Sequence, residues 1–188
     1  AFDKLAFRTG WSDDDYYLLI EGVGNQDISH AHVELNGIVR LNHLGRHWIV
    51  SNGYGRVLGV TNVSKSFSGR IRGPEDHNML VLTRGGDIVR EAPCCCAKLQ
   101  MGNSGKLFYF TGGLLNYGGV NWYRTVMVAA GMYTIVIDRV QIIEGGLEKG
   151  HIEWSAVGAV STVAGGFRLD QKGAGMDVTA ASGWAAEA

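Results

Sequence analysis

The sequence predicts an all-β protein, built as an antiparallel β-sandwich or a stack of large sheets. Runs of β-branched, aromatic and other apolar residues recur along the chain at strand length, for example at residues 133–140. Glycine is abundant, with 28 residues, and proline is scarce, with 2, which suits short strands joined by tight turns. No segment shows a sustained helical period with caps at its ends.

The expected strands follow one another along the whole chain. An apolar run at residues 16–21 follows an acidic turn at 12–15, and residues 37–42 and 47–50 flank a hairpin turn. Residues 79–83 and 87–90 flank Gly85-Gly86 as a second hairpin. Further runs at 106–111, 122–130, 133–140 and 151–157 are separated by glycine turns. Residues 1–172 are therefore predicted to form one sandwich domain, and the Ala- and Gly-rich residues 173–188 to fray or to end within an element.

The bulk composition excludes several function classes. The chain has 188 residues, 46% hydrophobic and 19% charged, as expected of a folded, soluble domain. A formal net charge of -1 gives no general field for nucleic acid or an anionic membrane. No apolar run approaches the ~18 residues of a spanning helix. The sequence starts without Met or a signal peptide, so we expect a fragment of a longer protein or a processed product.

Three consecutive cysteines, Cys94-Cys95-Cys96, form the only cysteine motif. Neighbouring residues of a strand point to opposite faces, so the three thiols are not expected to share one metal ion, and an odd count does not make a disulfide framework. A reactive thiol cluster is one interpretation. Small buried hydrophobic residues in a strand are the favoured one.

Two histidines and a glutamate occupy alternate positions at His30, His32 and Glu34. In a strand, alternate side chains lie on one face, so these three are expected to converge. Imidazole nitrogens and carboxylate oxygens bind zinc, and histidine also transfers protons near neutral pH. The pattern therefore predicts a metal site or a proton-transfer centre, with polar surface or hydrogen-bonded core histidines as the alternative.

Several short motifs occur in a fixed order along the chain: Phe2-Asp3-Lys4-Leu5-Ala6-Phe7-Arg8, Tyr17-Leu18-Leu19, His30-x-His32-x-Glu34, Gly45-Arg46-x-Trp48-Ile49-Val50-Ser51-x-Gly53-Tyr54, His77-Asn78, Trp122-x-Arg124-Thr125-Val126 and Ile135-Val136-Ile137-Asp138-Arg139-Val140. This succession resembles the β-sheet domain of the heparinase II/III-like polysaccharide lyases. The resemblance covers roughly residues 1–157, and the motifs together are more specific than any one of them.

The resemblance implies a larger enzyme in which a helical toroid domain precedes this β-sandwich, with an acidic polysaccharide bound between them. It implies β-elimination of uronic-acid chains such as heparan sulfate or alginate, and a periplasmic or secreted location. The reaction needs neutralisation of the uronate carboxylate, a base and an acid. Family members take most of these groups from the helical domain and one His from the sheet domain, which His30 matches. We therefore expect the isolated chain to be inactive.

The resemblance also implies a metal ion held by two His and one Asp. His32 and His77 match the histidines, but Ser51 occupies the Asp position. A hydroxyl is a poor zinc ligand beside a carboxylate, so a divalent ion, zinc above all, is expected to be held weakly or not at all. Glu34, on the predicted face of His32, or a water molecule would compensate for Ser51.

Substrate contacts are expected from a long basic loop at residues 53–76. Arg56, Arg70 and Arg72 would bind carboxylates or sulfates through forked hydrogen bonds, unless the loop is only solvated surface. Tyr54 would line the cleft or pack locally. Arg124, Asp138 and Arg139 match family positions and are equally explained as buried ion pairs that orient strands.

Two other functions compete with the lyase interpretation. The first is a non-catalytic carbohydrate-binding or structural sandwich that has lost its site, which Ser51 favours. The second is a cupin-like metal enzyme, because His-x-His followed by Glu and a later His also occurs there. The glycine-flanked spacing of that family is not met, and the chain is long for it.

Overall fold

The computed structural model describes residues 1–22, 34–51, 73–90 and 93–180. The described chain is all-β, as predicted, with a short 3-10 turn η1 at Pro74–Asp76. Its strands are β1 Lys4–Arg8, β2 Tyr17–Glu21, β3 Ile38–His43, β4 Arg46–Val50, β5 Leu80–Arg84, β6 Asp87–Ile88, β7 Ala97–Ser104, β8 Leu107–Tyr117, β9 Val120–Ala129, β10 Tyr133–Ile142, β11 Lys149–Ile152, β12 Ala159–Val163, β13 Gly166–Gln171 and β14 Ala174–Thr179. None of the described residues belongs to a helix long and apolar enough to cross a membrane.

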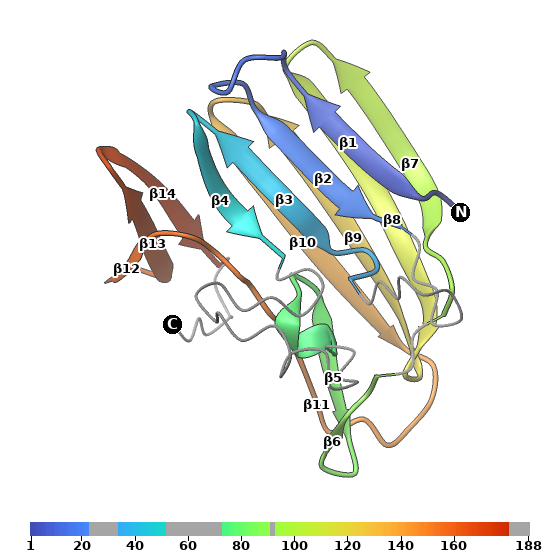
Figure 1. Cartoon of the computed structure of the whole chain (residues 1–188). Coiled ribbons are helices and arrows are strands. Elements are labelled where there is room, and N and C mark those ends of the chain that lie inside the picture. The colour runs from blue at the N-terminus through green and yellow to red at the C-terminus, as the bar shows by residue number, and fades with distance from the viewer. Residues whose placement is uncertain (23–33, 52–72, 91–92, 181–188) are drawn as a thin grey trace, which may run out of the picture.

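Two four-stranded antiparallel sheets make the sandwich, with strand orders β1-β2-β3-β4 and β10-β9-β8-β7 (Figure 1). Short hairpin turns join β3 to β4, β7 to β8, β8 to β9 and β9 to β10, as the glycine turns predict. The β3–β4 turn is one example, because Leu44 and Gly45 both have positive φ, 55° and 66°. Two such residues in succession form the turn that matches the twist of paired strands.

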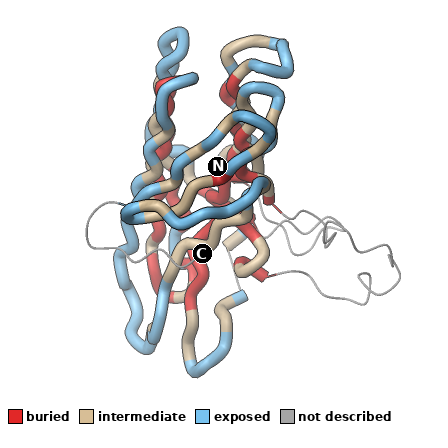
Figure 2. The backbone as a smooth tube through the Cα atoms, turned by 90° about the vertical axis from the view of Figure 1, so that its left-hand side faces the viewer, coloured by how far each residue is buried: buried red, intermediate tan, exposed pale blue. Residues whose placement is uncertain are grey.

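The core lies between the two sheets. Alternation places Leu18, Ile20 and Trp48 of one sheet opposite Phe110 and Val126 of the other, all almost fully buried. The Phe7 and Phe108 rings stack across the gap with centroids 4.8 Å apart. Figure 2 shows buried residues gathered along the strands and exposed ones at the hairpin turns. Burial of these aromatic and branched side chains provides most of the folding free energy.

Two three-stranded sheets, β11-β5-β6 and β12-β13-β14, flank the sandwich. Residues after β11 run past two other strands, since the Glu153 N–H donates to the Met79 carbonyl at 3.0 Å and the Val157 N–H to the Trp48 carbonyl at 3.0 Å. The segment that begins at Gly173 contributes β14, whose partner is β13. A second apolar cluster around Trp122 and Tyr117 fills the space under β5.

Two local expectations are wrong. Glu34 does not lie in a strand, because the Gly37 N–H donates to the Glu34 carbonyl at 2.8 Å and Asn36 has φ of 60°, so the chain turns there. The cysteines do not lie in a strand as three buried hydrophobic residues. Cys94 and Cys95 are joined by a disulfide ahead of β7, and only Cys96 is buried.

Candidate functional site

Three side chains that the sequence places far apart meet in a buried polar cluster, which we call the Glu34–Ser51–His77 cluster. The Ser51 Oγ and the His77 Nδ1 share a hydrogen bond of 2.7 Å. The same Nδ1 lies 3.4 Å from the Glu34 Oε2. Glu34 and His77 are 5% and 4% exposed, so this carboxylate and this imidazole interact away from bulk water.

Each member of the cluster is fixed by its own backbone. Glu34 opens the tight turn that leads into β3. Ser51 follows β4, and its N–H donates to the Val39 carbonyl at 2.8 Å. His77 closes η1, where its N–H donates to the Pro74 carbonyl at 3.1 Å. The side chains therefore meet on three anchored segments.

Arg124 of β9 ties two of these segments together from the opposite sheet. Its Nη1 donates to the carbonyls of Asn78 at 2.7 Å and Asn36 at 3.3 Å. These acceptors lie one residue after His77 and two residues after Glu34. Arg124 is 0% exposed, and its other donors bind both carboxylate oxygens of Asp138 at 2.8 and 3.1 Å. A bidentate pair of this kind gives the guanidinium a fixed direction.

Asn78 joins two further segments through its side chain. Its Nδ2 donates to the Ile38 carbonyl at 2.8 Å, and its Oδ1 accepts from the Ser155 N–H at 2.5 Å. Asn78 is fully buried, so both ends of its amide are satisfied within the protein. The sequence pattern includes Asn78 in the His77-Asn78 motif but assigns it no role. In the sequence, Asn78 could have been noticed as a polar residue that stands between His77 and the apolar strand β5.

The cluster fits a divalent cation in part. Zinc lies ~2.0–2.1 Å from nitrogen and oxygen ligands, so two ligands of a tetrahedral shell are ~3.3 Å apart. The separation of 3.4 Å between the Glu34 Oε2 and the His77 Nδ1 matches this value. The described residues contain no group of three His, Cys, Asp or Glu side chains that would hold a metal ion. The described chain thus offers two ligands, Glu34 and His77, and the Ser51 hydroxyl is hydrogen-bonded to His77.

The structure brings together Glu34, Ser51 and His77, the described members of the predicted metal site. The predicted catalytic His30 and the predicted ligand His32 lie outside the described residues. The same holds for the predicted substrate-binding residues, which are Tyr54, Arg56, Arg70 and Arg72. Arg139 does not join the part-buried ion pair of Arg124 and Asp138. It lies over the Tyr123 ring at 4.4 Å instead.

The fold is similar to that of solved heparinase III structures. A heparinase III with methylated lysines matches over 90% of this chain with a TM-score of 0.69 and 14% identity. A second heparinase III structure matches over 89% of this chain with a TM-score of 0.66 and 15% identity. The heparan sulfate lyase HepC from Pedobacter heparinus matches over 89% of this chain with a TM-score of 0.68 and 16% identity.

No protein-family model matches the sequence. No curated protein matches it either. The chain spans about a quarter of the length of the solved structures that it resembles, 25%, 26% and 25% of the three above. What the comparisons establish is a shared fold between this chain and about a quarter of each of these solved structures.

Proposed function

We propose that this chain is the β-sandwich part of a polysaccharide lyase that cleaves uronic-acid-containing acidic glycans by β-elimination. The observation that carries the proposal is the Glu34–Ser51–His77 cluster. Ser51 and His77, which the family resemblance assigns to one site, share a hydrogen bond of 2.7 Å, and Glu34 lies 3.4 Å from His77, in a fold similar to that of a solved heparan sulfate lyase. The helical domain that would complete the cleft is a further part of the proposal.

The chemistry assigns separate tasks to the residues of this chain. β-elimination removes the proton at C5 of the uronate and breaks the bond to the glycosidic oxygen. His30 would neutralise the developing charge or assist proton transfer, and the arginines Arg56, Arg70 and Arg72 would hold carboxylate or sulfate groups. The Glu34–Ser51–His77 cluster would position the chain that leads to His30. Since the helical domain supplies the other acid and base groups, we expect the isolated chain to be inactive.

A direct assay tests this assignment. The absorbance of unsaturated uronate products is followed with heparan sulfate and alginate, using the full-length protein and the isolated chain. We expect turnover from the full-length protein only. His30→Ala in the full-length protein should lower kcat by about two to four orders of magnitude, the range of one proton-transferring group, and leave KM nearly unchanged. His47→Ala is the matched control, because His47 is exposed and contacts Asn42 only through a surface hydrogen bond.

The competing function is a non-catalytic carbohydrate-binding module, and the observation that favours it is Ser51 in the expected Asp position. Under this alternative, full-length protein binds the glycan without releasing unsaturated products. Turnover that survives His30→Ala unchanged, or turnover by the isolated chain, would contradict the lyase assignment.

For the metal ion we propose a weak site in which Glu34 and His77 would be the described ligands. A bound divalent ion would polarise an oxygen of the substrate or tie the loops of the site together. We expect dialysed protein to retain less than one zinc per chain by elemental analysis, and Ser51→Asp to raise zinc affinity in calorimetric titration by about tenfold or more, because a carboxylate replaces a hydroxyl. Ser104→Asp, a similar change at an exposed serine that ends β7, is the control. One tightly held zinc per wild-type chain would overturn the weak-site view.

A further inference from the structure

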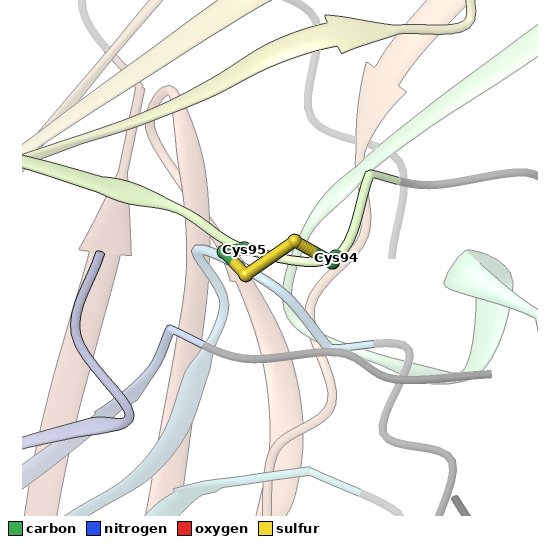
Figure 3. The surroundings of a disulfide bond; sticks show 2 residues. All are labelled: Cys94 and Cys95. Carbon is green, nitrogen blue, oxygen red and sulfur yellow. A yellow bond between two sulfur atoms is a disulfide. The ribbon is translucent and has the colours of Figure 1, made fainter. Parts of the chain in front are cut away.

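The two cysteines ahead of β7 form a bond between direct sequence neighbours. The Sγ atoms of Cys94 and Cys95 are joined in a disulfide, with a Cα–Cα distance of 3.8 Å (Figure 3). The pair follows Pro93 and precedes the strand that begins at Ala97. Most structural disulfides join segments that are distant in sequence and so restrict the unfolded chain. A bond between neighbours closes the smallest possible loop and restricts the unfolded chain least, so stabilising the fold does not explain it.

The pair is open to solvent at one end. Cys94 is exposed, Cys95 is half-buried and Cys96 is buried. A shallow cavity of about 420 Å³ opens beside the segment, and Pro93, the residue before Cys94, is part of its lining together with Arg84 and Asn116. Exposed disulfides are the ones that solution thiols reach and that serve labile or regulatory roles.

Cys96 is set apart from this chemistry although it is the next residue. Its side chain is 1% exposed in the apolar cluster around Trp122, and burial raises the pKa of its thiol to about 12. A thiol must ionise to attack a disulfide, so Cys96 does not compete for Cys95. Its N–H donates to the Gly22 carbonyl at 2.7 Å, which anchors this end of the segment to the end of β2.

We propose that Cys94 and Cys95 form a reversible thiol–disulfide site that exchanges with small-molecule thiols, while Cys96 stays reduced. A thiolate attacks the exposed Cys94 Sγ, the bond between Cys94 and Cys95 breaks, and the Cys95 thiolate leaves with the electron pair. A second thiolate then attacks the mixed disulfide, which frees Cys94 and releases the oxidised small molecule as its disulfide. The protein gains two electrons and two protons, and two small thiols lose them.

The proposed site is independent of the lyase assignment. Opening the bond breaks no pairing between the named strands, because Cys94 and Cys95 precede β7 and only Cys95 forms an isolated β-bridge. The anchored Cys96 separates it from β7, so the fold is expected to remain intact in both redox states. A structural change caused by thiols is therefore expected at the surface around Pro93 and at the backbone contact between Cys96 and Gly22.

Thiol counting on the folded protein tests the proposal. The full chain is oxidised with glutathione disulfide, freed of small molecules, and titrated with a chromogenic thiol reagent before and after reduction by glutathione. We expect no fast-reacting thiol in the oxidised form and two in the reduced form. The third thiol should appear only in denaturant. Intact mass should differ by about 2 Da, the two hydrogens of one disulfide.

Variants separate the three cysteines. Cys96→Ser should leave the two fast thiols of the reduced form unchanged, whereas Cys94→Ser combined with Cys95→Ser should abolish them. Peptide mapping of the oxidised protein should place the bond between residues 94 and 95. Three free thiols after oxidation, a bond that includes Cys96, or a disulfide that millimolar glutathione leaves closed in the folded protein would each overturn the proposal.

Discussion

Arg124 is a buried cation, and each of its three side-chain nitrogens donates to an oxygen atom of the protein. Two contact Asp138, and the third contacts the carbonyls of Asn36 and Asn78. The guanidinium also lies over the rings of Trp122 and Trp154, at 4.7 and 5.4 Å. The Asp138 side chain is 11% exposed, and its carboxylate offsets the loss of water by the fully buried guanidinium. Through its bonds to Asn36 and Asn78, Arg124 fixes the position of these two segments near the candidate site.

Replacing Arg124 by Met should lower the free energy of unfolding by about 3–5 kcal/mol, because the substitution leaves the largely shielded Asp138 carboxylate and the carbonyls of Asn36 and Asn78 without their donor. Urea unfolding followed by circular dichroism measures the change. Arg168→Met is the control, since Arg168 makes a similar pair with Asp170 and Asp177 on the exposed surface, where ion pairs contribute little. Equal losses in the two variants would contradict a special role for Arg124.

Tyr16 connects the two sheets through its hydroxyl, which lies 2.6 Å from the Thr134 Oγ1. Burial raises the pKa of Tyr16 from 10.0 to about 12, although the hydrogen bond to Thr134 lowers it. The folded state therefore keeps this proton longer than the unfolded state does. The contribution of the protonated Tyr16 hydroxyl to the free energy of unfolding is complete below pH 10 and is lost as the pH rises from 10 to 12.

Alkaline unfolding should show this loss. A shift of this size corresponds to about 2.7 kcal/mol at most. Between pH 10 and pH 12, the free energy of unfolding of Tyr16→Phe should fall less steeply with pH than that of the wild type. Urea titrations at each pH measure both. Tyr109→Phe, at a largely exposed ring, is the matched control. Parallel curves for wild type and Tyr16→Phe would show that Tyr16 does not ionise on unfolding in this range.

At the scale of single elements, the turn at residues 34–37 decides where the Glu34 carboxylate lies. Gly37 has no room for a side chain, because a Cβ there would lie 2.6 Å from the Glu34 carbonyl oxygen. The turn also contains Asn36, whose φ of 60° suits asparagine better than most residues. The geometry of the candidate site therefore depends on this turn as well as on the strands.

Gly37→Ala should destabilise the fold by about 1–3 kcal/mol, the usual cost of forcing a methyl group into a packed position. It should also shift the ring resonances of His77 in NMR spectra, because Glu34 moves with the turn. Gly145→Ala is the control, since a Cβ at Gly145 meets nothing within 4 Å. An unchanged His77 signal in Gly37→Ala would show that the turn does not set the cluster.

The sequence predicts elements well where local chemistry determines them. The hairpin at Gly85-Gly86 is predicted from its turn residues, and β9 and β10 from their alternation. The pairing of β5 with β11 joins residues 80–83 to 149–152, and no local pattern specifies a partner that distant. For the site, the family resemblance points to residues 51 and 77 and the assumed strand face to residue 34, and the three side chains lie together in the structure. The strand assumed at Glu34 is wrong because the pattern His-x-His-x-Glu does not reveal the turn that follows.

At the scale of the whole molecule, the sheets differ in how much core they share. Strands β8 and β9 lie in the middle of their sheet and carry Phe110, Trp122 and Val126, each fully buried. Strand β12 is mostly exposed, and its sheet joins the core through few residues, chiefly Leu169. Local opening requires little free energy where few apolar contacts are lost.

Hydrogen exchange should therefore be graded across the fold. Amides of β9 are expected to exchange only with global unfolding, and amides of β12 and β14 to exchange faster through local opening. Exchange followed by mass spectrometry over increasing urea concentrations measures both. Matching free energies of exchange for β9 and β12 would show that the chain opens only as one unit.

The choice of acceptors at Arg124 has a consequence for how substitutions reach the frame of this site. Two of its contacts end on main-chain carbonyls, of Asn36 and Asn78, and every amino acid possesses such a group. These two bonds therefore do not use any side chain at residues 34, 51 and 77. A side chain exchanged within the cluster leaves the acceptors of Arg124 in place, so the backbone frame and the chemistry of the cluster are separable by mutation.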